Sequence, residues 1–276
     1  MRRDDVLFPT YRENGALLWR GVTPEEILTL WGGDERGHLF AGAPGDFPIC
    51  ITIGSQAAHA AGVAYKFKLR REAHVAVCAL GDGATSKGDV YEATNFAGVH
   101  NLPVVFVIAN NEWAISVPRR QQSASITLAQ KAIAAGIDGW QVDGNDVIAV
   151  RASVDEAIAK AAAGKGASCI EALTYRLSDH TTADDASRYR PDEEVRARWL
   201  AEPVLRLRNY LVAQDAWSKR QEEQLLVECQ QRMEVAAEAY LRMAPELPGA
   251  MFDHLYQTLP AALELQRRQA EEFNNG

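Results

Sequence analysis

Two uniformly apolar runs constrain the fold of this chain more than any other feature of its sequence. They are HVAVCAL at residues 74–80 and PVVFVIA at residues 103–109. Neither run alternates between apolar and polar residues, which is typical of parallel strands that are covered on both faces. Polar and glycine residues follow each run, GDG at 81–83 and NN at 110–111. The pattern predicts two buried parallel strands with polar groups at their carboxyl ends.

Helical and strand patterns alternate along the chain as far as residue 190. The predicted helices cover 55–70, 84–100, 126–136 and 153–163, and two further predicted strands cover 139–144 and 168–176. This alternation predicts an α/β fold, with a doubly wound, mostly parallel sheet and helices on both faces. From residue 191 the pattern changes to long, charged helices, clearest at 192–211 and 218–243. We therefore expect an α/β domain over residues 1–190 and a C-terminal helical extension over 191–276.

Composition and charge argue against several classes of protein. The chain is 47% hydrophobic, enough for a sizeable core, and its formal net charge of -8 argues against a nucleic-acid binder held by a basic surface. The four cysteines lie far apart without a C-x-x-C motif, as expected of reduced thiols rather than of a disulfide frame or a zinc site. No apolar run approaches the roughly 20 residues that span a bilayer, and the N-terminus does not resemble a signal peptide. The predicted location is cytoplasmic, with no nucleic-acid or membrane partner.

The polar residues after the two apolar runs are predicted to meet at one edge of the sheet. Ligands of open parallel sheets bind outside the carboxyl ends of the strands. Glycine lets the backbone approach a ligand closely, and the N–H groups of a helix start favour phosphate. Asp82 and Asn111 supply hard oxygen atoms, which together with phosphate oxygens suit Mg²⁺. The residues alone predict a metal–diphosphate site, and the alternative is an Asp cap beside an Asn turn.

A family resemblance extends this interpretation. GDG followed by NN resembles the thiamine-diphosphate signature, and the stretches GSQAAHAAGVAYKFK and VAVCALGDGATSKGDVYEATNFAGVHNLPVVFVIANNEWAISVP are similar to one family of alpha subunits. These are the alpha subunits of the decarboxylating component of 2-oxo acid dehydrogenase complexes. PTYRENG extends the resemblance upstream, and VDGNDV and EALTYRLSDHTTADDASRYR extend it downstream, so that it covers most of residues 4–212. It implies the thiamine-diphosphate-binding fold for residues 1–190.

The resemblance implies a role for each matching residue at the two strand ends. Asp82 and Asn111 match the side-chain ligands of Mg²⁺, and the carbonyl oxygen of Trp113 matches the third protein ligand. Gly83 and Ala84 match backbone donors to the diphosphate.

Two further segments match other parts of the cofactor site. Tyr11 and Arg12 match a pair that reaches the diphosphate, and a guanidinium group pairs well with phosphate oxygens. Without the resemblance, an arginine such as Arg12 in a charged terminus is more often a solvated residue. Ile51 and Ile53 match backbone contacts to the aminopyrimidine ring, and the Ile53 side chain matches a wedge that bends the cofactor. An ordinary core isoleucine is the alternative there.

His180 is the candidate catalytic residue. It lies in the polar stretch LSDHTTADDASRYR, where a histidine can hydrogen-bond phosphate or move protons near neutral pH. The resemblance implies a loop that orders when the cofactor binds, in which His180 helps to position the cofactor and the lipoyl acceptor. Thr181 matches a serine that is phosphorylated in animal relatives, and we expect it to be unmodified. Four polar residues of the stretch are expected to pair within the loop: Asp184, Asp185, Arg188 and Tyr189. The other histidines are expected to be structural or on the surface: His38, His59, His74, His100 and His254.

By resemblance, the chain is part of an oxidoreductase that decarboxylates a 2-oxo acid and transfers the acyl group reductively to a lipoyl disulfide. The implied cofactors are Mg²⁺ and thiamine diphosphate, which supplies the carbanion chemistry. The implied partners are the lipoyl domain of the acyltransferase component and a beta subunit, which brings the glutamate that activates the cofactor ring in an α₂β₂ heterotetramer. Ala109 stands where branched-chain relatives carry an arginine, which favours pyruvate as the substrate.

One departure from the family pattern leaves alternatives open. Family members carry a longer helical segment before the stretch DDVLFPTYR, which here begins close to Met1. One alternative is a truncated, non-catalytic assembly homologue, and another is a branched-chain 2-oxo acid or acetoin dehydrogenase alpha subunit. Because Tyr11 and Arg12 lie close to the terminus, we expect them to be prone to fraying.

Overall fold

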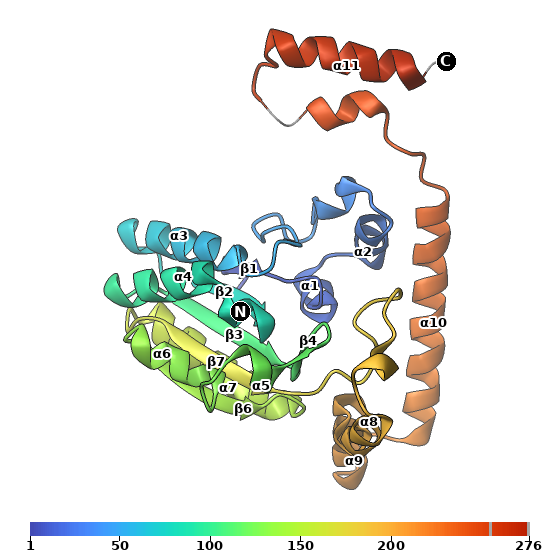
Figure 1. The fold of residues 1–276 in the computed structure, drawn as a ribbon. Coiled ribbons are helices and arrows are strands. Elements are labelled where there is room, and N and C mark those ends of the chain that lie inside the picture. Colours follow the sequence, from blue (N-terminus) through green and yellow to red (C-terminus); the bar gives the residue numbers. More distant parts are fainter. Residues whose placement is uncertain (254–255, 275–276) are drawn as a thin grey trace. The chain divides into compact units, whose positions relative to one another are not determined.

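The computed structural model describes residues 1–253 and 256–274, which divide into two compact units (Figure 1). The first unit comprises Met1–Thr23 and Phe40–Val227, and the second comprises Pro24–Leu39 and Glu228–Gly276. The sheet, and with it the predicted site, belongs to the first unit.

The first unit is built on a parallel sheet in the order β1-β2-β3-β7-β6. Its strands are β1 (Val6–Phe8), β2 (Ala76–Gly81), β3 (Val104–Asn110), β6 (Asp138–Asp143) and β7 (Ser168–Leu173). The two apolar runs form β2 and β3, which pair in parallel so that Gly81 lies opposite Ala109. A two-stranded antiparallel ribbon, β4 (Trp113–Ala114) and β5 (Val117–Pro118), follows β3.

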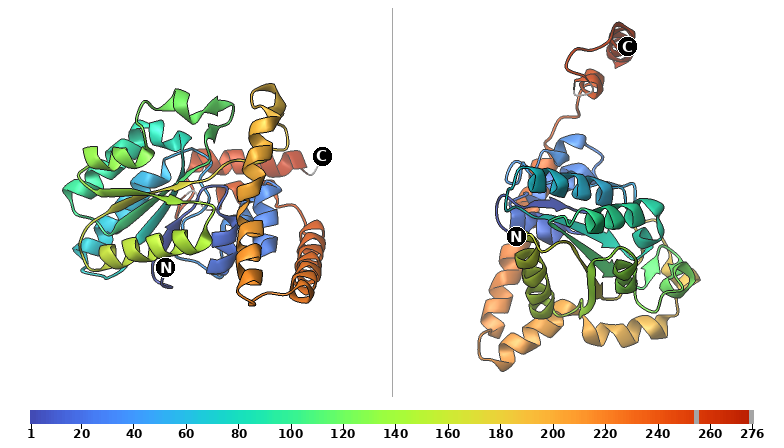
Figure 2. Two further views of the ribbon diagram at one scale, coloured as in Figure 1. Left: turned by 90° about the horizontal axis from the view of Figure 1, so that it is seen from below. Right: turned by 90° about the vertical axis from the view of Figure 1, so that its left-hand side faces the viewer.

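Helices cover both faces of the sheet (Figure 2). α3 (Gln56–Leu69) and α4 (Gly88–Val99) pack side by side on one face, and η3 (Leu128–Gln130) and α6 (Lys131–Ala134) join the same core. α7 (Val147–Ala162) packs against β3, β6 and β7. Along the chain, β1, β2, β3 and β6 follow one another in the same direction across the sheet, and the chain then turns back from β6 to β7. Because parallel crossovers are right-handed, this reversal places α7 on the face opposite to α3 and α4. The predicted doubly wound α/β fold is confirmed.

Some elements differ from the predicted ranges. The predicted helix at 84–100 starts as a tight turn, η2 (Gly83–Ser86), and the helix predicted at 126–136 is reduced to η3 and α6. The predicted strand at 168–176 ends at Leu173. Beyond it, the N–H groups of Thr174 and Arg176 donate to the carbonyls of Asn110 and Asn111, so the chain leaves the sheet to run beside the residues that follow β3.

The helical stretch that begins at residue 192 is interrupted where Pro203 starts a new helix. α8 (Asp192–Arg198) leads into η5 (Trp199–Ala201), and α9 (Pro203–Ala213) follows. Glu202 caps α9 by accepting from the N–H groups of Val204 (3.1 Å) and Leu205 (2.6 Å). Proline is favoured at a first helical turn because its missing N–H has no partner there.

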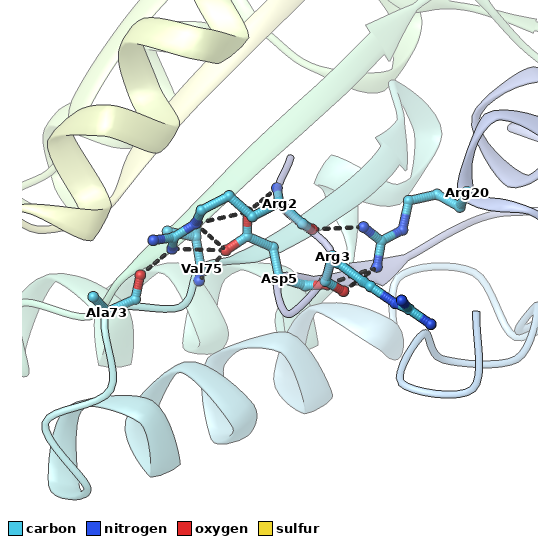
Figure 3. A network of polar contacts seen from close by, with 6 residues as sticks. All are labelled: Arg2, Arg3, Asp5, Arg20, Ala73 and Val75. Carbon is cyan, nitrogen blue, oxygen red and sulfur yellow. Dashed lines mark hydrogen bonds and ion pairs between the residues drawn. The ribbon is translucent and has the colours of Figure 1, made fainter. Parts of the chain in front are cut away.

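A network of arginines around the buried carboxylate of Asp5 holds the residues before β1 (Figure 3). Asp5, 1% exposed, accepts hydrogen bonds from Arg2 Nη2 (2.9 Å) and from the N–H of Val75 (3.0 Å). Arg2 also donates to the carbonyl of Ala73, and Arg20 donates to the carbonyls of Arg2 (2.8 Å) and Asp5 (2.7 Å). These bonds hold the residues just before β1 against the residues just before β2.

A buried ion pair completes this network. Arg20, in α1 (Asn14–Arg20), donates through Nε and Nη2 to the two carboxylate oxygens of Asp46, both at 2.7 Å. Asp46 also accepts from the N–H of Leu7 in β1 (2.8 Å). Tyr11 and Arg12 therefore follow a strand that these side chains anchor, and the fraying expected from their place in the sequence stays a prediction.

The second unit joins α2 (Pro24–Trp31) and η1 (Glu35–His38) to the C-terminal part of the chain. A side chain at Gly32 would overlap the ring of Tyr240 in α10 (Lys219–Leu241). Arg36 donates to the carbonyl of Ala244 (2.8 Å). Farther along, α11 (Ala261–Asn274) packs on η6 (Pro248–Phe252) with an ion pair between Arg267 and Asp253 (2.8 Å). Within the described ranges, no helix has both the length and the apolar character needed to cross a membrane.

We expect Asp46→Ala to lower the free energy of unfolding by about 3 kcal/mol, because it leaves the buried Arg20 cation and the Leu7 N–H without their acceptor. Urea denaturation followed by circular dichroism measures this. The control is Asp155→Ala, which removes an ion pair with Arg151 whose side chains are 78% and 57% exposed and which we expect to change nothing measurable. Equal midpoints for both variants would contradict the assigned role of Asp46.

Candidate functional site

The segments that follow β2 and β3 pack directly against each other. Gly83 faces Ala114 so closely that a Cβ at Gly83 would lie 2.7 Å from the Ala114 Cβ. Gln122, in α5 (Arg119–Gln122), links the two segments: its Nε2 donates to Asp82 Oδ2 (3.2 Å) and to the carbonyl of Val117 (3.1 Å). The structure thus brings GDG and the residues after NN together at the carboxyl edge of the sheet.

Asp82 is a buried carboxylate whose charge is incompletely compensated. It is 3% exposed, and burial raises its pKa; the hydrogen bond from Gln122 and the backbone N–H groups of Asp82 and Gly83 oppose this increase, and the nearby charge of Glu112 adds a little to it. Asp82 stands at the N-cap position of η2, yet among the described residues its side chain makes no capping hydrogen bond. The alternative of a simple Asp cap is therefore not found, and a bound cation would supply the missing positive charge.

Asn111 opens a strained turn. Its Oδ1 accepts from the N–H of Trp113 (3.1 Å), so the Asn turn weighed as the alternative does exist, and the amide oxygen keeps a second lone pair. Glu112 (φ 70°) and Ile115 (φ 55°) adopt left-handed backbone conformations, which cost about 1–3 kcal/mol each for residues other than glycine. The carbonyl of Glu112 accepts from the N–H of Arg119 (2.8 Å). Such strain persists only where the surroundings fix the backbone.

Trp113 supplies a peptide oxygen to the same edge. Its side chain is buried, and its carbonyl accepts from Arg176 Nη1 (3.3 Å), which leaves one lone pair for a further partner. Arg176 Nη2 also donates to the carbonyl of Ile115 (2.8 Å). The donor set of Asp82, Asn111 and Trp113 is a carboxylate, an amide oxygen and a peptide oxygen. These are hard oxygen donors, which fit Mg²⁺ when phosphate oxygens complete the coordination.

Hydrogen bonds from neighbouring side chains hold the turn at residues 83–86, which is predicted to donate to a diphosphate. Ala84 is buried, and the hydroxyl of Thr85 donates to the carbonyl of Asp82 (2.7 Å). Lys131 Nζ donates to the carbonyl of Thr85 (2.6 Å) and to its hydroxyl (2.9 Å). The backbone at Gly83 and Ala84 is therefore held by α6 on one side and by Asp82 on the other.

Two predicted residues far apart in sequence meet at the end of β1. Arg12 Nη2 lies 3.1 Å from His180 Nδ1 and donates to the His180 carbonyl (3.1 Å). The ring of Tyr11 meets the His180 ring edge-on, with centroids 6.3 Å apart. Burial lowers the pKa of His180, and the cations of Arg12 and Arg176 lower it further. His180 is therefore favoured in its neutral form.

The His180 loop is connected to the turn at residues 111–115 through Arg176. Arg176, 5% exposed, donates to Tyr189 Oη (2.7 Å), and Tyr189 donates to Asp184. Asp184 Oδ2 also accepts from the backbone N–H of His180 (2.7 Å). The predicted pairing within the loop is confirmed for Asp184 and Tyr189, and the guanidinium group of Arg176 extends it to the carbonyls of Trp113 and Ile115.

The remaining predicted site residues lie outside the core. Ile51 is 66% exposed and Ile53 is 39% exposed, so neither is an ordinary core isoleucine; their cofactor contacts stay predictions.

Three of the other histidines pack against aromatic rings, as expected of structural residues: His59, His74 and His100. His254 lies outside the described residues.

Three residues of the site were not predicted. Gln122 lies in the polar segment PRRQQSAS, which carries no periodic pattern. Glu171 is a buried charge within the apolar strand β7, and Arg176 is a buried charge just after that strand. A charged residue inside an apolar strand is a signal in itself, because charges are almost never fully buried without partners.

Comparison with known proteins points to one family. The family model of the dehydrogenase E1 component matches residues 1–245. The chain is 44% identical over 271 residues to "3-methyl-2-oxobutanoate dehydrogenase subunit alpha" of Mycobacterium tuberculosis, covering 98% of this chain and 73% of that protein. It is 38% identical over 273 residues to "Pyruvate dehydrogenase E1 component subunit alpha" of Mycoplasma genitalium, covering 99% of this chain and 76% of that protein. The protein of the same name from Staphylococcus aureus is 37% identical over 268 residues, 96% of this chain and 72% of that protein.

We expect Arg12→Ala to raise the pKa of His180, because it removes a cation that disfavours protonation of the imidazole. A histidine-labelled NMR titration, with His180→Ala for assignment, measures this. Arg188→Ala is the matched control, since Arg188 lies in the same loop and is not among the groups that shift His180. A His180 pKa that stays the same or falls in Arg12→Ala would contradict the contact.

Proposed function

The chain belongs to the dehydrogenase E1 component family, as an alpha subunit of a 2-oxo acid dehydrogenase, and from this premise we propose that it binds thiamine diphosphate and Mg²⁺. With a beta subunit, it would carry out the oxidative decarboxylation of a 2-oxo acid and the reductive acylation of a lipoyl group. The observation that carries the proposal is the buried Asp82 carboxylate beside the strained turn of Asn111 and Trp113.

In this proposal each part of the edge holds one part of the cofactor. Asp82, Asn111 and the carbonyl of Trp113 hold Mg²⁺, while the N–H groups of Gly83 and Ala84 bind the diphosphate. Tyr11 and Arg12 reach the diphosphate from the end of β1, where the guanidinium fork suits phosphate oxygens. When bound, thiamine diphosphate supplies the carbanion chemistry of the decarboxylation. Ile51 and Ile53 are proposed contacts to its aminopyrimidine ring.

His180 is the proposed catalytic residue, and its contacts determine which nitrogen carries its proton. A guanidinium group can only donate, so Arg12 requires His180 Nδ1 to be an acceptor. The neutral ring then carries its proton on Nε2, and the lowered pKa favours that neutral form. His180 would thus offer an N–H donor to the cofactor or to the lipoyl acceptor.

We propose an α₂β₂ heterotetramer that receives the lipoyl domain of the acyltransferase component. The relatives are named alpha subunits, and the glutamate that activates the cofactor ring is assigned to the beta subunit by resemblance alone. Residues 1–190 are the proposed thiamine-diphosphate-binding domain and 191–276 the helical extension. The cytoplasmic location stays a prediction.

Pyruvate is the proposed substrate, and a branched-chain 2-oxo acid is the second candidate. Ala109 supports pyruvate, because the resemblance places an arginine there in branched-chain members. The second candidate is favoured by identity: the relative named for 3-methyl-2-oxobutanoate is 44% identical, and those named for pyruvate are 37–38% identical. Acetoin, and a non-catalytic assembly role, remain the alternatives.

We expect Asp82→Asn to abolish Mg²⁺-dependent binding of thiamine diphosphate, because the amide lacks the charge that the cation requires. Calorimetry on the complex with the beta subunit measures binding, and circular dichroism checks the fold. The control is Asp89→Asn, which removes the exposed partner of Lys87 six residues beyond the GDG turn and should bind as the wild type does. Unchanged affinity in Asp82→Asn would disprove the assignment of Asp82.

Substrate profiling of the reconstituted complex separates the candidate reactions. We expect reduction of an artificial electron acceptor with pyruvate at the highest kcat/KM, a lower value with 3-methyl-2-oxobutanoate, and none with acetoin. A higher kcat/KM with the branched-chain acid would transfer the assignment to that substrate. A complex that binds the cofactor but turns over none of the three would support the assembly role.

A further inference from the structure

We propose that Glu171 is a positioning residue of the metal site, which acts through the side chain of Asn110 to fix the turn that presents Asn111 and the Trp113 carbonyl. The inference rests on the proposed function, because it assigns a role toward the Mg²⁺ that this site would hold. It also explains why two asparagines stand at the end of β3: the second is the proposed ligand, and the first connects the turn to a buried carboxylate.

Glu171 is a charged residue buried within the sheet, on the strand next to its β6 edge. It lies in the middle of β7, opposite Ile108 of β3 and Gln141 of β6, and it is 1% exposed. Three donors converge on its two oxygens. Asn110 Nδ2 donates to Oε1 (2.7 Å), while the N–H of Ala129 (3.0 Å) and Gln141 Nε2 (3.1 Å) donate to Oε2. An ionised carboxylate, which only accepts, matches this arrangement.

The carboxylate determines which way the Asn110 amide points. Asn110 is 2% exposed, and its two polar atoms face different partners. Because Glu171 only accepts, the NH₂ group of Asn110 must face it. This orientation leaves Oδ1 on the other side, where it accepts from the backbone N–H of Glu112 (3.2 Å). Glu171 therefore acts on the backbone of Glu112 through one intervening amide.

The backbone of Glu112 needs this support. Its φ of 70° lies in the left-handed region, and the residues on either side of it are the two proposed ligands from this turn, Asn111 and Trp113. If the Asn110 amide rotated by half a turn, its NH₂ group would face the Glu112 N–H, and two donors would oppose each other. The left-handed turn would lose that bond, and both ligand oxygens would lose their fixed direction. Residues that orient metal ligands in this way typically contribute 10–100-fold to affinity or activity.

Glutamine cannot replace Glu171 alone. It offers one acceptor oxygen and one NH₂ group in place of two acceptors. If its oxygen faces Asn110, its NH₂ group opposes the N–H of Ala129. If its NH₂ group faces Asn110, the Asn110 amide must rotate and oppose the N–H of Glu112. The single exchange Asn110→Asp also fails, because it places two carboxylates against each other.

The two exchanges together restore every hydrogen bond. In Asn110→Asp combined with Glu171→Gln, the new glutamine donates to one oxygen of the new aspartate, and the other oxygen accepts from the N–H of Glu112. The carbonyl oxygen of the glutamine accepts from Ala129 and Gln141, and the net charge of the pair is unchanged. A residue that serves only to fill space would not show this reciprocity, so the rescue tests the mechanism.

The experiment compares the wild type, both single variants and the double variant, each in complex with the beta subunit. Calorimetry gives the Mg²⁺ concentration for half-saturation at fixed thiamine diphosphate, and the EPR spectrum of bound Mn²⁺ reports the metal environment without turnover. Gln141→Ala is the control, because it removes one donor to Glu171 and leaves the Asn110 contact in place. Thermal unfolding of each cofactor-free complex shows whether it is folded.

We expect each single variant to raise the half-saturating Mg²⁺ concentration by about 10–100-fold. For Gln141→Ala this concentration should stay within about twofold of the wild-type value, and for the double variant within about threefold of it. The Mn²⁺ spectrum should broaden in the single variants and recover in the double variant. Wild-type affinity in either single variant, or a folded double variant that binds no better than the single ones, overturns the inference. If a single variant does not assemble, recovery of both assembly and binding in the double variant supports it. A wild-type complex that binds no thiamine diphosphate refutes the proposed function instead.

Discussion

The parallel pairing of β2 with β3 is the constraint on which the site depends. It places Gly81 opposite Ala109, so the two strands end at neighbouring positions and the turns that follow them start side by side. The two turns then pack together through the contact of Gly83 with Ala114. A slip of one residue would separate Asp82 from the Asn111 turn. It would also exchange the side chains that one strand presents to the two faces of the sheet, which the close packing of the helices on both faces opposes. The packing of the core therefore supports the register on which the polar edge depends.

Three buried charges surround this edge, and each is compensated in a different way. Glu171 has three hydrogen-bond donors, and Arg176 is surrounded by carbonyl and hydroxyl oxygens. Burial raises the pKa of Asp82 and lowers the pKa of Arg176, so it disfavours the charged form of both. The side chain that donates to Asp82 is that of Gln122, a neutral amide, and the proposed cation would lie beside this carboxylate. The contrast arises from partners, because all three residues are buried to a similar degree.

The sequence alone was sufficient to predict the sheet and the edge, and insufficient for the contacts between distant segments. GDG and NN could be placed together because parallel strands share one carboxyl edge. The contact of Arg12 with His180 joins residues 168 positions apart, and no local pattern predicts it; only the family resemblance suggested that both belong to one site. β1 was missed because three residues are too short for a periodic pattern. The charge at Glu171 was visible in the strand, but its partners depend on how three elements pack.

The contact between Arg12 and His180 also couples the His180 loop to the local opening of β1. β1 is a short edge strand, and when it detaches, Arg12 leaves His180 with it. The opening equilibrium of β1 therefore limits the fraction of molecules in which His180 is held in place. Each loss of about 1.4 kcal/mol in that local free energy would raise the detached fraction roughly tenfold. Asp5, Asp46 and Arg20, none of which touches the site, thereby contribute to how often the site is complete.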